Sequence, residues 1–174
     1  PVNVIITITP EPVLDPNLDN STCSDVASGI NLQVDPGITG VAAASYNITS
    51  INVAAGLTPK VGNASAGNGQ AANAIAGDVF TNTTGGSLDV DYTIIPVSGA
   101  GCLGDPVVVS LTVNPEPVFS TSDATVCSGS NSGLTLTTSN IVADLFHIDA
   151  IRKDGSLGAD AGNANTGNDQ ASNA

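Results

Sequence analysis

The sequence predicts an all-β protein made of tandem β-sandwich modules of roughly a hundred residues each. Three observations predict it: an aliphatic composition, alternation of apolar and polar residues, and internal repeats at a nearly constant spacing. Of the 174 residues, 41% are hydrophobic but only 3% are aromatic, so the core must consist of Val, Ile, Leu and Ala side chains. The 19 glycines and 10 prolines suit many turns and disfavour long helices.

Three segments recur in the same order and set the length of the module. The Pro-Glu-Pro at 10–12 returns at 115–117, Cys23 returns as Cys127, and the Asn- and Ala-rich stretch 63–74 returns at 163–174. The offsets are 105, 104 and 100 residues, and small deletions in surface loops explain the differences between them. We therefore expect the following parts: residues 1–9 as the last strand of a preceding module, residues 10–114 as one complete module, and residues 115–174 as an incomplete second module.

Apolar residues at every second position predict the strands. The clearest alternation is found in 2–9, 30–34, 88–94 and 107–113, and this period indicates strands with one buried face. Segment 144–153 has apolar residues at helical spacing, but its repeat partner 44–53 has the pattern of a strand, and we expect both to be strands. The Gly-, Ala- and Asn-rich stretch 56–77 is expected to be a long loop or a weak edge strand.

The three cysteines fit one disulfide per module. Cys23 and Cys102 belong to the expected complete module, and the partner of Cys127 would lie beyond residue 174. We expect a Cys23–Cys102 bond, which would place the protein outside a reducing cytosol. The alternative is two free buried thiols. A metal site is disfavoured because neither cysteine has a Cys or His close to it in the sequence.

An ordered set of short motifs resembles the PKD-like repeat, an immunoglobulin-like module. The motifs are Val126-Cys-Ser-Gly-Ser130, Ala64-Ser-Ala-Gly-Asn-Gly69, Thr81-Asn-Thr83, Gly101-Cys-Leu-Gly-Asp-Pro106 and Asn114-Pro-Glu-Pro117. The resemblance covers essentially the whole chain and implies a spacer or stalk in a large secreted bacterial surface protein of the adhesin type. Two features depart from the family pattern: Asp25 replaces a small residue, and Asn47 and His147 replace a frequent Trp.

The inventory of reactive side chains disfavours an enzyme. His147 is the sole histidine, its repeat partner is Asn47, and the expected complete module contains no histidine for a catalytic triad. Asp89 and Asp91 alternate on one strand and are expected to be solvated rather than a glycosidase pair. We expect no cofactor, with calcium as the one alternative, because Asp15 and Asp19 offer oxygen ligands in a turn near a module junction.

The net charge and the glycosylation sequons indicate which partners and modifications to expect. The formal charge of −13 disfavours nucleic acid and anionic membrane surfaces as partners. The sequence contains no run of 18 apolar residues, so we expect no membrane-spanning helix. Asn-x-Ser/Thr sequons make four residues candidates for glycosylation: Asn20, Asn47, Asn63 and Asn82.

These observations predict a non-catalytic, extracellular structural module that assembles head to tail at a bacterial cell surface, as a stalk, fibre or adhesin. The alternative is a carbohydrate-binding accessory module of a secreted enzyme that uses the stretch 56–77. The expected partners are neighbouring modules or copies in a linear fibre, joined either by a continuous chain or by exchange of strands, and surface glycans are further candidate partners.

Overall fold

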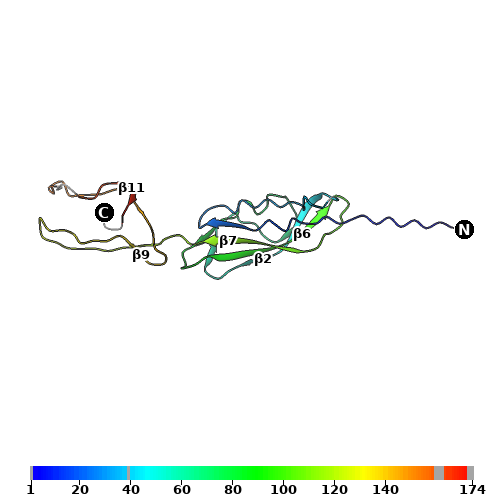
Figure 1. Cartoon of the computed structure of the whole chain (residues 1–174), viewed down its shortest axis with the longest axis horizontal. Helices are drawn as coiled ribbons and strands as arrows, with labels where there is room; N and C mark the ends of the chain where they lie inside the picture. The colour runs from blue at the N-terminus through cyan, green and yellow to red at the C-terminus, as the bar shows by residue number, and fades with distance from the viewer. Residues whose placement is uncertain (1, 39, 159–162, 172–174) are drawn as a thin grey trace. The chain divides into compact units, whose positions relative to one another are not determined.

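A computed structural model describes residues 2–38, 40–158 and 163–171 of the chain. The chain forms two compact units, the first ending at Glu116 and the second beginning at Pro117. All regular structure in the described residues is β-strand, which confirms the predicted all-β class. Figure 1 shows the course of the chain through these strands.

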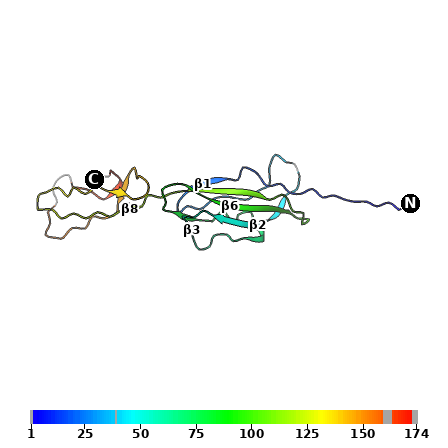
Figure 2. The same cartoon turned by 90° about the horizontal axis from the view of Figure 1, so that it is seen from below.

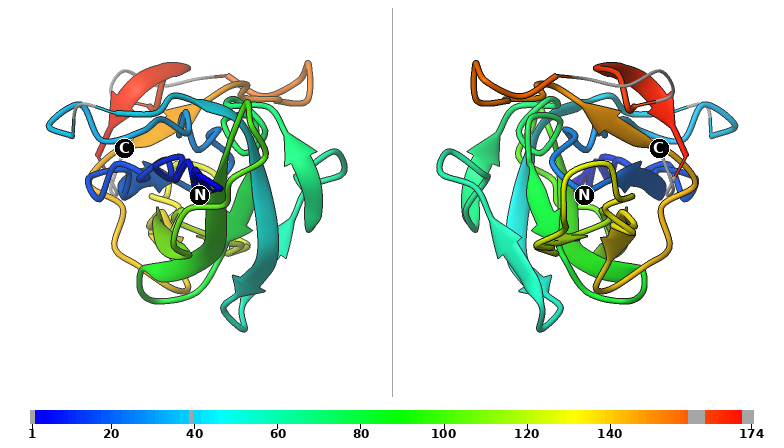
Figure 3. Two further views of the ribbon diagram at one scale, coloured as in Figure 1. Left: turned by 90° about the vertical axis from the view of Figure 1, so that its right-hand side faces the viewer. Right: turned by 90° about the vertical axis from the view of Figure 1, so that its left-hand side faces the viewer.

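A five-stranded sheet forms one layer of the first unit, in the order β1-β7-β6-β2-β4. Its strands are β1 (Asn20–Cys23), β2 (Ala43–Val53), β4 (Gly67–Gln70), β6 (Leu88–Ser98) and β7 (Val107–Asn114). All neighbours are antiparallel except β1 and β7, which run parallel from Asn20↔Leu111 to Cys23↔Asn114. Strand β4 forms one edge of the sheet, so part of the stretch 56–77 is the edge strand that we predicted. Figures 2 and 3 show the twisted strands β2 and β6 side by side.

Alternation places one face of this sheet in the core, as predicted for 88–94 and 107–113. Val90, Tyr92 and Ile94 of β6 are fully buried, and Leu111 and Val113 of β7 are equally buried. The core is aliphatic apart from three aromatic residues, and its members are Leu14, Ile30, Leu32, Tyr46, Ile48, Leu57, Ile75, Phe80, Val90, Tyr92, Ile94, Val109, Leu111 and Val113.

The opposite layer is less regular. It contains the short pair β3 (Leu57–Pro59) and β5 (Phe80–Asn82) and two isolated bridges, Leu14↔Val34 and Ala27↔Val79. The strand predicted for 30–34 is wrong: Ile30 and Leu32 are buried as expected, but their backbones form no ladder. The amide of Leu32 bonds to the carbonyl of Ala72, whereas the carbonyl of Gln33 accepts from Asp15, so the bonds run to different segments.

Residues 2–9 extend away from the sandwich of the first unit without forming a strand pair (Figure 1). Their apolar side chains are strongly exposed, from 81% at Val4 and Ile6 to 91% at Val2. The alternation that predicts a strand here is present, but the segment has no sheet partner within the described chain.

The second unit contains four short strands: β8 (Phe119–Ser120), β9 (Thr137–Thr138), β10 (Phe146–Ile148) and β11 (Gly167–Gln170). The pair β10–β11 joins Phe146 to Gln170 and Ile148 to Gly167. The pair β2–β4 of the first unit joins the residues 100 positions earlier, with a register shift at the same place. Segment 144–153 therefore contains a short strand, as predicted, and not a helix.

Candidate functional site

The candidate site of this module comprises its two ends, where the chain enters and leaves the sandwich. At the exit end, Asn82 of β5 is 0% exposed and holds the last residues of β7. Its side-chain nitrogen donates to the carbonyls of Val113 (2.8 Å) and Gly86 (3.0 Å), and its side-chain oxygen accepts from the amide of Thr84 (3.0 Å). The amide of Glu116 then donates to the carbonyl of Asn82 (2.9 Å). The chain thus leaves the module through a fixed set of hydrogen bonds.

At the entry end, a close backbone contact requires glycine. A Cβ atom on Gly104 would lie 2.0 Å from the carbonyl oxygen of Pro12 and 2.9 Å from Cγ of Pro96. Pro12 is almost fully buried there, and Gly101, in the preceding turn, has a φ of 83°. The glycines of the Gly-Cys-Leu-Gly motif therefore shape the turn that holds the entering chain.

A buried carboxylate ties the irregular layer to the sheet. Asp78, 2% exposed, accepts from the hydroxyl of Tyr92 (2.8 Å) and from the amide of Ala64 (2.7 Å). Burial raises the pKa of Asp78, and the two hydrogen bonds oppose this rise. Burial, together with the neighbouring Asp78, raises the pKa of Tyr92 far above its ordinary value, so this hydroxyl stays a donor.

The fold contradicts the predicted Cys23–Cys102 disulfide. All three cysteines are free, and Cys23 and Cys102 lie at opposite ends of β6. Cys23 pairs with Asn114 at the exit end, whereas the amide of Cys102 bonds to Ser98 at the entry end. Ten residues of strand separate the two levels by about 30 Å, and a disulfide needs Cα atoms within about 7 Å of each other.

The four sequons occupy different environments. Asn20 is exposed, and Asn47 is half-buried with its side-chain oxygen accepting from the amide of Gly69 (3.0 Å). Asn63 makes two bonds to the backbone of Val79, at 2.8 and 2.9 Å. Both amide hydrogens of Asn82 are used inside the core, so glycosylation of Asn82 is incompatible with this fold and that prediction is wrong. Glycosylation of Asn63 would break its two bonds to Val79.

Asp15 and Asp19, the candidate calcium ligands, use their carboxylate oxygens in separate hydrogen bonds. The oxygens of Asp15 accept from the amide of Asn17 (2.9 Å) and from the side chain of Gln33 (2.8 Å), and these bonds, that of Asn17 foremost, lower the pKa of Asp15. Asp19 accepts from the amide of Ser110 instead (2.8 Å). Among the described residues, no group of three or more His, Cys, Asp and Glu side chains is placed to share a metal ion.

The remaining candidates are placed as follows. The side chain of His147 is more than half exposed and lies 3.9 Å from Asp149. Asp89 and Asp91 accept from the hydroxyls of Thr112 and Ser110 on the neighbouring strand. Tyr46, Phe80 and Tyr92, the aromatic residues of the first unit, are all buried, so the stretch 56–77 has no aromatic surface on which a sugar could stack. No helix in the described part of the chain is long and apolar enough to cross a membrane.

The architecture defines the first unit as an immunoglobulin-like β-sandwich. The family model of the PKD-like domain matches residues 20–117, more than half of the chain, and the chain therefore belongs to the PKD-like domain family. Such domains are generally non-catalytic and typically occur in extracellular proteins. No curated protein and no solved structure matches the chain.

Two functional features escaped the sequence analysis. The role of Asn82 as a buried brace was hidden because Asn-Thr-Thr is also a glycosylation sequon. The Asp78–Tyr92 pair joins residues of two different layers, and neither residue lies in a motif that signals the contact. The repeat held one usable signal: Asn63 and Ala64, which bind the segment around Asp78, are identical to Asn163 and Ala164.

Proposed function

We propose that this chain is a structural part of an extracellular stalk, fibre or adhesin at a bacterial cell surface, in which PKD-like modules follow one another head to tail. In this arrangement residues 1–9 are the last strand of a preceding module, residues 10–114 form one complete module, and residues 115–174 begin the next. The observation that carries the proposal is the unpaired segment 2–9.

Segment 2–9 has the sequence of a β7 strand. Val4, Ile6 and Ile8 are 81%, 81% and 86% exposed, whereas the residues 105 positions later, in β7, are at most 1% exposed. Burying three such side chains would stabilise the protein by several kcal/mol, on the order of 1.5–3 kcal/mol each. The same residue pattern is therefore buried where it forms strand β7, whereas segment 2–9 finds no site within the described chain that buries it.

The position of β7 determines how the segment would pair. Strand β7 lies between β6 and β1, antiparallel to the first and parallel to the second. Segment 2–9 would occupy the same position in the adjacent module, with its apolar residues in that core. Because the donating segment and the accepting sheet are different surfaces, the assembly is linear and does not close. Such an assembly could be one continuous polypeptide or a series of strand-exchanged copies, and we favour the continuous polypeptide because the family is known for long arrays.

Backbone bonds at equivalent positions of the two units support the proposal that the module is repeated. Besides the common register of β2–β4 and β10–β11, the turn after Cys23 and the turn after Cys127 are closed by equivalent bonds of 3.2 and 3.1 Å. The bridge Leu14↔Val34 of the first unit likewise corresponds to the pair Phe119↔Thr138 of the second.

The structure of the native assembly tests the proposal. We expect segment 2–9 to pair within the sheet of an adjacent module and its amides to be protected from hydrogen exchange. Ile6→Asp should abolish this protection and break the assembly, because its counterpart Leu111 is fully buried. Ile5→Asp is the matched control, since its counterpart Ser110 lies on the outer face. A segment 2–9 folded back onto residues 10–114 would contradict the proposal.

Glycans could decorate this array at Asn20, which is exposed although its side-chain nitrogen donates to the carbonyl of Ser28 (2.8 Å), and at Asn47, whose side-chain oxygen accepts from the amide of Gly69. In a digest of the protein from its native source, peptides containing Asn20 or Asn47 with masses above those of the bare peptides would support this. The carbohydrate-binding alternative is weakened by the burial of the aromatic residues, and we expect no binding in an assay against a panel of polysaccharides.

A further inference from the structure

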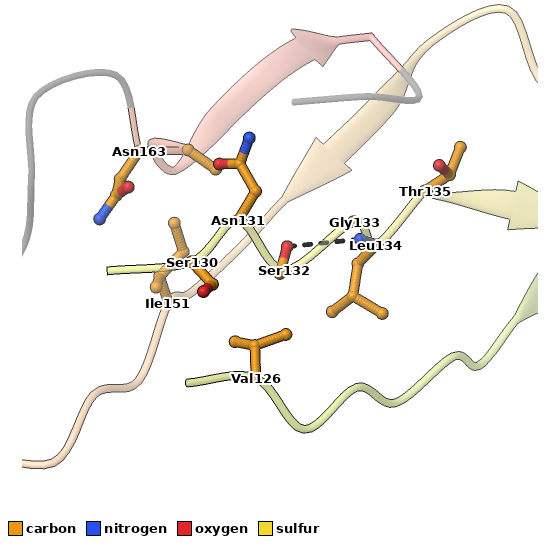
Figure 4. A pocket seen from close by; sticks show the side chains of 10 residues that line it. Val126, Ser130, Asn131, Ser132, Gly133, Leu134, Thr135, Ile151 and Asn163 are labelled. Carbon is orange, nitrogen blue, oxygen red and sulfur yellow. Dashed lines mark hydrogen bonds between the residues drawn. The ribbon is translucent and has the colours of Figure 1, made fainter. Parts of the chain in front are cut away.

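The second unit contains an open groove of about 610 Å³. Its walls come from three segments that lie far apart in the sequence: Val126 and residues 130–135, Ile151, and Asn163 with Ala164 (Figure 4). Leu134 and Ile151 are 40% and 49% exposed. The corresponding place in the first unit is filled, and its occupant shows what the groove is shaped to hold.

In the first unit this place is taken by residues 75–79, here called the strap. Ile75 is 0% exposed and belongs to the same core cluster as Ile30. The strap is fastened on one side by Ser28 and Gly29. The amide of Ser28 donates to the carbonyl of Asp78 (2.8 Å), the amide of Gly29 donates to that of Ala76 (3.0 Å), and the hydroxyl of Ser28 donates to the carbonyl of Ile75.

On its other side the strap is fastened by Asn63 and Ala64. The side chain of Asn63 donates to the carbonyl of Val79 (2.8 Å) and accepts from its amide (2.9 Å). The amide of Ala64 donates to the carboxylate of Asp78 (2.7 Å). Four residues thus fasten the strap from these two sides, three of them through the backbone. The hydroxyl of Tyr92 also donates to Asp78 (2.8 Å), and the amide of Lys60 donates to the carbonyl of Val79 (3.0 Å).

All four of these residues recur unchanged in the groove of the second unit. Ser28 and Gly29 correspond to Ser132 and Gly133 at an offset of 104, and Asn63 and Ala64 correspond to Asn163 and Ala164 at an offset of 100. The four counterparts line the groove.

The local geometry of the groove also matches. Gly29 and Gly133 have φ values of 68° and 65°. The amide of Ile30 donates to the hydroxyl oxygen of Ser28, and the amide of Leu134 donates to that of Ser132, each at 3.3 Å (Figure 4). The groove is therefore preorganised for a strap, with its backbone donors already in the bound conformation.

We propose that this groove binds a second strap, a chain segment with the pattern of Ile75 to Val79: an apolar residue, two small residues, an Asp and a Val. The inference rests on the proposed function, because a repeat array is what would supply such a segment. The occupant differs from the strap of the first unit, which is already buried in its own module.

A synthetic peptide of residues 74–80, Ala-Ile-Ala-Gly-Asp-Val-Phe, tests this with the full chain. We expect the amide NMR signals of Ser132, Gly133 and Ala164 to shift on titration. The signals of Ser28, Gly29 and Ala64 should stay unchanged, because their groove is filled. A peptide with Ala in place of Ile75 should bind at least about tenfold more weakly, since it loses the buried side chain.

The control variants separate the groove from its surroundings. Asn163→Ala should weaken peptide binding, whereas Asn165→Ala, outside the groove, should not. Absence of shifts in the second unit at millimolar peptide, or equal shifts in both units, would overturn the proposal. Failure of this test is distinguishable from failure of the proposed array, because pairing of segment 2–9 is measured separately and does not involve the groove.

Discussion

Asp25 and its counterpart Gly129 share a left-handed backbone conformation, with φ of 64° and 78°. A non-glycine residue is strained there, so the glycine at position 129 fits this backbone conformation better than Asp25 does. Asp25 offsets the strain with its side chain, which accepts from the hydroxyl of Thr81 (2.6 Å) and pairs with Lys60 (3.0 Å). These two contacts, that of Thr81 first, lower the pKa of Asp25.

Asp78 should make the first unit less stable as the pH rises. Burial raises its folded-state pKa above the ordinary value of 3.8, so its contribution to stability is present below that pH and is lost as the pH rises through the folded-state pKa. Asp78→Asn removes the titration: its side-chain oxygen can still accept from the amide of Ala64, and its NH2 group can donate to the hydroxyl oxygen of Tyr92, so that the direction of this second bond reverses. We therefore expect the variant to be more stable relative to the native protein at about pH 7 than at about pH 3. Urea denaturation measures this as a larger difference in unfolding free energy, variant minus native, at the higher pH.

Asp25→Asn is the control of opposite sign. Its folded-state pKa is lowered, so its stabilisation is present above pH 3.8 and is lost as the pH falls through the folded-state pKa. This variant should lose more stability at the higher pH than at the lower one. Parallel pH curves for Asp78→Asn and the native protein would contradict the role assigned to Asp78.

At the scale of the elements, the turn between β6 and β7 determines whether the entering chain can pack. Gly104→Ala would place a methyl group 2.0 Å from the carbonyl oxygen of Pro12, and the backbone must move to relieve this contact. We expect a loss of about 1–3 kcal/mol or more, seen as a lower Tm in thermal denaturation. Gly99→Ala is the matched control in the same turn, because a Cβ there has no neighbour within 4 Å. Equal Tm values for the two variants would show that the close contact does not matter.

How well the elements could be predicted depended on how each one is paired. β6 and β7 were predictable because a strand inside a sheet buries every second residue. Residues 30–34 show the same alternation, yet their backbone bonds go to two separate segments, and burial alone carries no information on the partner. The cysteine pair failed for a similar reason. Cys23 and Cys102 were assigned to each other by counting, but neither the count nor the spacing says that they lie at opposite ends of one strand.

At the scale of the whole molecule, the path of the chain gives the module a mechanical axis. The chain enters next to Gly104 at one end and leaves through the Asn82 brace at the other. Its first and last sheet strands, β1 and β7, are parallel neighbours. Tension on the two ends of the module therefore slides β1 along β7 and loads all the bonds of the pair together, instead of opening them one by one. This arrangement suits a spacer that transmits force.

The load on the β1–β7 pair can be tested by two Asp→Ala variants pulled end to end in single-molecule force spectroscopy. Asp19→Ala removes a 2.8 Å bond to the amide of Ser110 that extends the β1–β7 pair, and Asp89→Ala removes a 2.8 Å bond to Thr112 that joins β6 to β7. Each should cost about 0.5–1.5 kcal/mol of equilibrium stability. Only Asp19→Ala should lower the unfolding force, because β6 lies outside the loaded pair. Each rupture should release on the order of 300 Å of chain. If both variants lower the force equally, the β1–β7 pair is not the element that bears the load.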